Sequence, residues 1–137
     1  MVTDGVDWFG GSVGQDPYVD EAVADAERAG VIVYAIYSPG AGHSGHSYWR
    51  AYWGQIYLSQ VADETGGEAY YIGLSGAPVT FVPYLDGIAA RLPRQYLLSF
   101  LAKPEKKAGM RRVRLQTEVS NAELVAASQV YVPASPK

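Results

Sequence analysis

Three side chains of this chain lie in sequence patterns that suggest a cation site. Asp4 lies in the segment 2–5 (VTDG), which is typical of a parallel strand ending at the carboxyl edge of a sheet, where a carboxylate can face a ligand or metal. His43 and His46, the two histidines of the chain, are three residues apart among glycines and serines. They could begin a zinc or nickel site, but that needs a third ligand, and no Asp or Glu lies within ten residues. The alternative for the histidines is an exposed polar loop.

A nucleophilic enzyme would require a serine activated by one of these histidines and a carboxylate. Ser75 lies between Leu74 and Gly76, but the Gly-x-Ser-x-Gly spacing of a nucleophile elbow is not met. The absence of cysteine excludes disulfides and thiolate nucleophiles. We therefore expect a noncatalytic protein, with a hydrolase or metal-binding protein that uses His43 and His46 as the weaker alternative.

The composition indicates a globular chain. Its 137 residues are 48% apolar and 18% charged, which suits one domain or part of one. The net charge of −3 predicts no nucleic-acid partner and no attraction to an acidic membrane surface. No segment approaches the about 20 apolar residues of a membrane span, and Asp4 and Asp7 stand where a signal peptide would be basic. We expect a cytosolic chain, or one whose targeting signal lies on a part not present.

Strand and helix patterns alternate over the first 94 residues. Asp16 and Pro17 predict the start of a helix that ends at Gly30. The β-branched and aromatic run 31–37 predicts a strand covered on both faces. The remaining elements expected are a helix over about 48–65, a strand over 69–72 and a helix over about 85–92.

Beyond residue 94 the apolar residues alternate as in antiparallel strands. Segments 95–101 and 112–119 predict a hairpin around a turn at 103–109, and 130–132 predicts a last short strand. One face of the hairpin should be buried: Tyr96, Leu98, Phe100, Val113, Leu115 and Thr117. The other face should point outward: Arg112, Arg114 and Gln116. The expected fold class is α/β, a partial doubly wound, mainly parallel sheet (1–94) with a C-terminal antiparallel β-hairpin and tail (95–137).

Two further groups of residues could form an interaction surface. An aromatic and apolar stripe has helical spacing and predicts either core packing or an interface anchor: Trp49, Tyr52, Trp53 and Ile56. A basic cluster lies on and beside the predicted hairpin: Lys103, Lys106, Lys107, Arg111, Arg112 and Arg114. It could contact an acidic partner or phosphate, or it could be a solvated turn and the outward face of an edge strand.

Taken in order, these segments resemble the second half of a von Willebrand factor A domain. The resemblance is carried by 2–5 (VTDG), by 22–36, by Leu58 with 62–71 (ADETGGEAYY), and by 88–96, which contains Ile88, Leu92, Gln95 and Tyr96. The region 96–131 is similar to the VWFA-related family abundant in acidobacteria, in which a hairpin and a tyrosine-rich strand follow the last helix.

The resemblance implies a noncatalytic, adhesion-type protein-interaction module, or a fragment of one. An intact A domain holds a divalent cation at the carboxyl edge of the sheet with an Asp-x-Ser-x-Ser loop, a threonine and an aspartate, and Asp4 matches that last position. The Asp-x-Ser-x-Ser motif is absent from the sequence, so Asp4 is expected to be vestigial. We expect no cofactor, with Mg²⁺ bound only if the missing amino-terminal half is supplied. The surface would retain Asp4 and the loops 8–15, 38–47 and 73–78, and the implied location is extracytoplasmic or in the cell envelope.

The same resemblance implies a truncated domain. Its missing first strand would neighbour residues 2–4, so the sheet would have an unpaired edge that seeks another chain. We therefore expect self-association through this truncated sheet edge, in addition to a protein partner of unknown identity. A structural oligomerisation unit is the alternative function.

Overall fold

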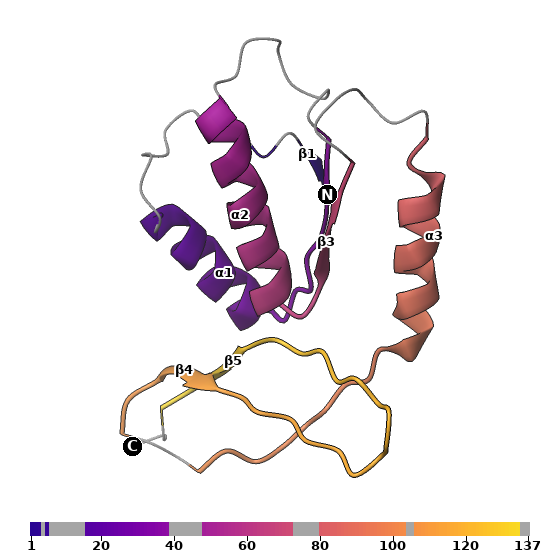
Figure 1. Ribbon diagram of the computed structural model, residues 1–137. Coiled ribbons are helices and arrows are strands. Elements are labelled where there is room, and N and C mark those ends of the chain that lie inside the picture. Colours follow the sequence, from indigo (N-terminus) through magenta and orange to yellow (C-terminus); the bar gives the residue numbers. More distant parts are fainter. Residues whose placement is uncertain (4, 6–15, 39–47, 73–79, 104–105, 135–137) are drawn as a thin grey trace.

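The computed structural model describes residues 1–3, 5, 16–38, 48–72, 80–103 and 106–134 (Figure 1). Its elements are β1 (Val2–Thr3), α1 (Pro17–Ala29), β2 (Tyr34–Tyr37), α2 (Tyr48–Glu64), β3 (Glu68–Tyr71), α3 (Val82–Arg91), the 3₁₀ turn η1 (Leu92–Arg94), β4 (Gly109–Arg112) and β5 (Gln129–Val132). The expected mixed α/β class is confirmed, with a parallel sheet and a separate antiparallel strand pair in the described part of the chain.

The parallel sheet has the order β1-β2-β3, so strands that follow one another in the sequence are neighbours in space. Val2 pairs with Ile36, and Ile36 pairs with Tyr70. Helices α1 and α2 lie on one side of this sheet and α3 on the other (Figure 1). This layering follows from the parallel connections, because each crossover helix must cover a sheet face.

Helix α1 has the ends that its sequence predicts. The Asp16 carboxylate accepts a hydrogen bond of 2.9 Å from the Tyr18 amide, and Pro17 occupies the first turn, where no amide partner is needed. Gly30 ends the helix in the left-handed region at φ 65°, and its amide donates back to the last turn. The expectation for this helix is confirmed because its start and stop signals are local.

Helix α2 packs on the sheet through a row of small and apolar residues four apart. Gly54, Leu58 and Ala62 are buried, and Leu58 forms a core cluster with Tyr37. A Cβ on Gly54 would lie 2.2 Å from the carbonyl oxygen of Gly5, so only glycine permits this close approach. The backbone of the chain's first residues therefore lies directly against α2.

The predicted aromatic stripe is not the core face of α2. Trp49 and Tyr52 are exposed, while Trp53 and Ile56 are half-buried. The row that begins at Gly54 has the smaller side chains and lets the helix approach the sheet closely. The core-packing interpretation is therefore wrong for Trp49 and Tyr52, which lie on the flank of the helix.

The strand predicted over 31–37 is shorter than expected. Residues 34–37 form β2, whereas Val31 and Ile32 are exposed and do not belong to it. The Val33 amide donates to the Thr65 hydroxyl, at 3.1 Å, instead of to a neighbouring strand. β1 has two residues and pairs only with Ile36 and Tyr37 of β2. Ala35, Ile36 and Tyr37 are buried, so the expected cover is found over these three residues of the strand.

The predicted hairpin of 95–101 with 112–119 does not form. β4 pairs antiparallel with β5, with Gly109 opposite Val132 and Arg112 opposite Gln129, whereas 95–101 and 113–118 form no strand. Tyr96, Leu98 and Phe100, which should be buried, are 92%, 63% and 55% exposed. The alternation of apolar and polar residues indicates that a segment can form a strand, but it does not specify which other strand that segment pairs with. The short strand expected at 130–132 is confirmed within β5.

Other expectations for the helices and strands are confirmed with small shifts of their ends. The second helix spans Tyr48–Glu64, the third strand Glu68–Tyr71, and the third helix Val82–Arg91. None of the helices in the described ranges has the length and apolar character to span a bilayer.

Candidate binding groove

The segment after η1 carries a high density of exposed apolar side chains. Its start is attached to the sheet, because the Gln95 side-chain amide donates to the Tyr34 hydroxyl at 3.2 Å. Beyond this point Tyr96, Leu97 and Leu101 are almost fully exposed. The segment 95–101 therefore presents large apolar groups to solvent on a connection between the two sheets.

A groove lies where three stretches of the C-terminal region meet. Its volume is about 510 Å³, within the range of about 300–1,000 Å³ typical of ligand pockets. The walls come from residues 98–103, from β4 and the residues after it, and from β5. We call it the basic groove, and its lining is Leu98, Phe100, Ala102, Lys103, Arg111, Arg112, Val113, Arg114, Leu115, Val130 and Val132.

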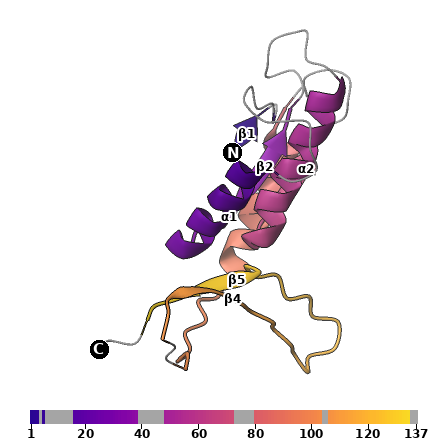
Figure 2. The same cartoon turned by 90° about the vertical axis from the view of Figure 1, so that its left-hand side faces the viewer.

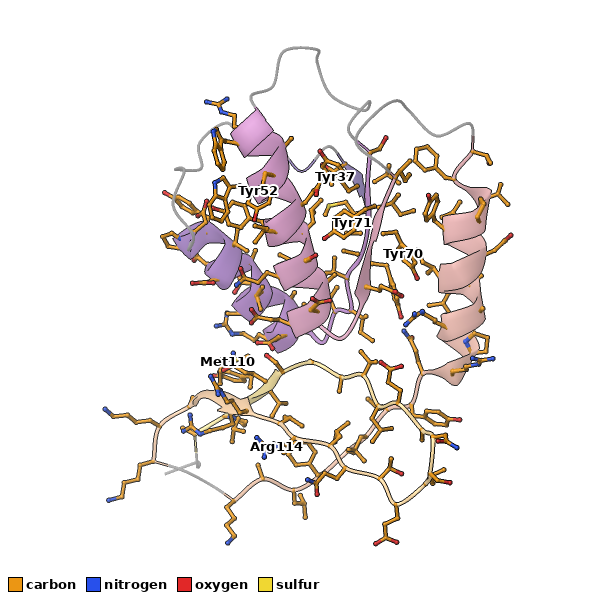
Figure 3. All side chains as sticks on the ribbon, viewed as in Figure 1. Tyr37, Tyr52, Tyr70, Tyr71, Met110 and Arg114 are labelled. Atoms are coloured by element: carbon orange, nitrogen blue, oxygen red, sulfur yellow. The ribbon has the colours of Figure 1, made fainter. Side chains whose placement is uncertain are left out.

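The charged residues that line the basic groove are all positive. Four of its lining residues are Lys or Arg and none is Asp or Glu. The guanidinium of Arg111 donates to the Met110 carbonyl oxygen at 2.9 Å, which holds it against its own strand. Figure 3 labels Arg114 in the C-terminal region, below the helices. We call the apolar lining residues the floor of the groove and its four Lys and Arg residues the rim; a lining of this composition suits an amphipathic, negatively charged partner.

A buried carboxylate holds the groove region on the helices. Glu27 of α1 is buried and accepts from the Gln129 amide at 2.9 Å and from the Ser128 hydroxyl at 3.2 Å. The Ser128 amide donates in turn to the Glu64 carbonyl oxygen, at the end of α2. Figure 2 shows β4 and β5 side by side under the ends of these helices. β5, one wall of the groove, is thus attached to both helices of one layer.

The Arg28 guanidinium adds a second contact between α1 and β5. It lies 5.6 Å from the centre of the Tyr131 ring, in cation–π geometry. The same guanidinium pairs with the Asp25 carboxylate at 2.7 Å on the exposed surface of α1. Arg28 directly follows Glu27 in the sequence, so two adjacent residues of α1 both contact β5.

A group of polar side chains lies on the face of the parallel sheet that α3 covers. Tyr70 points toward α3, whereas Tyr37 and Tyr71 lie on the side of α2 (Figure 3). Arg91 of α3 forms an ion pair with Glu68, and the Tyr70 and Tyr84 rings meet edge to face at 6.0 Å. Burial raises the pKa of the Tyr70 hydroxyl, and the neighbouring Glu68 carboxylate raises it further.

The predicted cation ligands lie outside the described residues. This holds for Asp4, His43 and His46, and for most of the three loops expected at the carboxyl edge. Beside Asp4, the Thr3 hydroxyl accepts from the Gly5 amide at 3.1 Å, and the Thr3 carbonyl oxygen accepts from the Ser38 amide at 2.8 Å. Within the ranges that the structure describes, no three potential metal ligands gather in one place.

The structure brings together most of the predicted basic cluster. Lys103, Arg111, Arg112 and Arg114 line the groove, while Lys106 and Lys107 are exposed on the connection to β4. The sequence pattern leaves the role of this cluster open and does not indicate the groove, because the alternation of 95–101 predicts that its apolar residues lie on a buried hairpin face. The signal that could have found the groove is the short distance in sequence between that apolar run and the cluster.

Four aromatic residues of α2 form a second group, of which Trp49 and Tyr52 are exposed. Trp49 and Tyr52 meet edge to face at 6.4 Å, Tyr52 and Trp53 at 5.6 Å, and Trp53 stacks on Tyr57 at 6.0 Å. These contacts order the flank of the helix. The side chains pack on one another, and Trp53 and Tyr57 are half-buried, so the group is a weaker candidate site than the basic groove.

Comparisons of this chain with protein-family models, with curated proteins and with solved structures find no match.

Proposed function

We propose that this chain is a noncatalytic protein-interaction module of the adhesion type that its resemblance to von Willebrand factor A domains suggests. The observation that carries the proposal is the exposed apolar segment 95–101 on the wall of the basic groove. The parallel order β1-β2-β3, with helices on both faces, is compatible with the second half of such a domain.

The exposed segment offers apolar surface that a partner can bury. Four of its side chains, Leu97, Leu98, Phe100 and Leu101, are more than half exposed. Complete burial of one such side chain stabilises a complex by about 1.5–3 kcal/mol, so the four provide at most about 6–12 kcal/mol. The cost of bringing two molecules together is estimated at about 4–15 kcal/mol. The two ranges overlap, so burial of these side chains offsets much of the cost of association, and further contacts with the partner must supply the remaining affinity.

Peptide selection tests the proposal. A random peptide library displayed on phage is selected on the wild-type chain and on the double variant Leu98→Asp/Phe100→Asp, which places two carboxylates in the groove. The matched control is Leu124→Asp/Val125→Asp, because these residues are also exposed in the C-terminal region but do not line the groove. We expect sequences enriched on the wild type and on the control but not on the groove variant. Failure to enrich any sequence, or equal enrichment on all three proteins, would contradict the proposal.

Self-association is a second candidate function, favoured by two observations. β1 is an edge of the parallel sheet in the described part of the chain, and Val2 on it is exposed. In addition, residues 1–94 hold eleven acidic and four basic residues, a formal charge of −7, whereas 95–137 hold three acidic and seven basic, a charge of +4. Opposite charges on two regions favour contact between copies. Light scattering over a range of protein concentrations tests this function, and a monomer at every concentration would refute it.

A further inference from the structure

We infer that the basic groove binds an extended peptide in which large apolar residues alternate with Asp or Glu, and that this peptide pairs as a strand with residues 95–101. The inference rests on the proposed function and names the partner of the same site. It depends on three properties of the groove: its unpaired backbone, its apolar floor and its cationic rim.

The backbone of one groove wall is available for pairing. Residues 96–103 make no backbone hydrogen bond to another described residue, although their composition is typical of a strand. Such a segment is not a strand in the free chain, but its unpaired amide and carbonyl groups can accept an added strand from a partner, as in β-augmentation. Charged residues often block this addition at sheet edges, yet 95–101 (QYLLSFL) contains none.

The floor of the groove selects the apolar half of the peptide. Leu98 and Phe100, two residues apart, line the same cavity as Val130 and Val132 of β5, which are also two residues apart. Side chains of an added strand alternate between its two faces, so every second residue of the peptide can enter a floor of this kind. Apolar residues at alternate positions therefore fit the spacing of the lining.

The rim selects the charged half. Lys103, Arg112 and Arg114 line the groove together with Arg111, and no lining residue is acidic. Lys106 and Lys107 add positive charge on the connection nearby. Carboxylates at the positions between the apolar residues are complementary to this rim, whereas Lys or Arg there would be repelled.

Fluorescence anisotropy of a labelled peptide, with Leu or Val alternating with Glu, tests the inference on the full chain. We expect saturable binding to the wild type and a loss of affinity of about tenfold or more in Arg112→Glu/Arg114→Glu. The matched control is Lys106→Glu/Lys107→Glu, which makes the same change of charge outside the groove lining and should lose much less affinity. The far-ultraviolet circular dichroism of each variant should match the wild type.

Three further peptides separate the parts of the inference. A peptide with Lys in place of Glu should not bind, one with all the Glu at one end should bind at least about tenfold more weakly, and one N-methylated on all its amides should lose binding because it has no amide to donate at either edge of the strand. Equal binding of any of these three and the alternating peptide would overturn the inference.

The remaining outcomes distinguish this inference from the proposed function. If phage selection finds groove-dependent peptides that are neither acidic nor alternating, the module stands and the inference fails. If neither the selected nor the designed peptide binds, both fail. If the wild type is a dimer that Arg112→Glu/Arg114→Glu dissociates and that excludes the peptide, the groove is occupied by a second copy and the inference is wrong.

Discussion

The Glu27 carboxylate is the contact whose loss should have the clearest effect on the C-terminal region. It is buried, and its oxygen Oε1 accepts from both the Gln129 amide and the Ser128 hydroxyl. In Glu27→Ala, the Gln129 amide and the Ser128 hydroxyl lose this hydrogen-bond acceptor. A donor left unsatisfied in a buried place costs about 1–3 kcal/mol.

Part of this cost is offset. The second oxygen, Oε2, is buried and has no hydrogen-bond partner among the described residues, so removing the carboxylate also removes an unfavourable desolvation. We therefore expect Glu27→Ala to lower the free energy of unfolding by about 2–4 kcal/mol. For a chain of this size this is a fall in melting temperature of roughly 6–15 °C. Glu27→Gln keeps one oxygen acceptor and should lose only about 1 kcal/mol.

Urea denaturation and amide hydrogen exchange measure the effect. The matched control is Glu21→Ala, an exposed glutamate of the same helix, which should change stability by less than about 0.5 kcal/mol. In Glu27→Ala the amides of β4 and β5 should lose protection, while those of β2 stay protected. If Glu27→Ala behaves like the control, or if β2 and β5 lose protection equally, the argument that this carboxylate holds the C-terminal strands on α1 is refuted.

Three other predictions follow from single contacts. Gly54→Ala should destabilise the chain by about 1–3 kcal/mol in thermal denaturation, because its Cβ would meet the carbonyl oxygen of Gly5, and a wild-type melting temperature would contradict this close approach. The pKa of Tyr70 is raised in the folded state, so the folded chain holds that proton more tightly and its stability should fall as pH rises above the ordinary value of 10.0. Urea titrations on either side of that pH should show a smaller fall in Tyr70→Phe, and an equal fall would exclude this tyrosine as the cause. Millimolar Mg²⁺ should leave the melting temperature unchanged, since Asp4 is the one expected adhesion-site ligand in the sequence; a rise that Asp4→Ala abolishes would refute this.

Helix ends and the order of elements could be predicted because their causes are local. Asp16 and Gly30 set the ends of α1 through hydrogen bonds to residues within one turn. The alternation of strands with helices then required parallel pairing, because only a crossover connection returns the chain to the same edge of the sheet. These features need no information about distant residues.

The candidate site could be predicted only in part. The basic residues from Lys103 to Arg114 were recognised as a cluster, but their neighbours were assigned incorrectly, because 95–101 was paired with 112–119. Both segments have the alternation of strands, and nothing in that alternation distinguishes one partner from another. The groove exists because β4 pairs with β5 instead, which leaves 95–101 as an exposed wall.

The sequence by itself determined the α/β class, the ends of α1 and the positions of most helices and strands. The tertiary structure decided which strands pair, which row of α2 faces the sheet and where the basic residues gather. The Gln129 amide reaches Glu27 across 102 positions of the chain, and the contact between Gly54 and Gly5 spans nearly fifty. Such contacts depend on the packing of whole helices and strands, and the local signals that end a helix do not predict them.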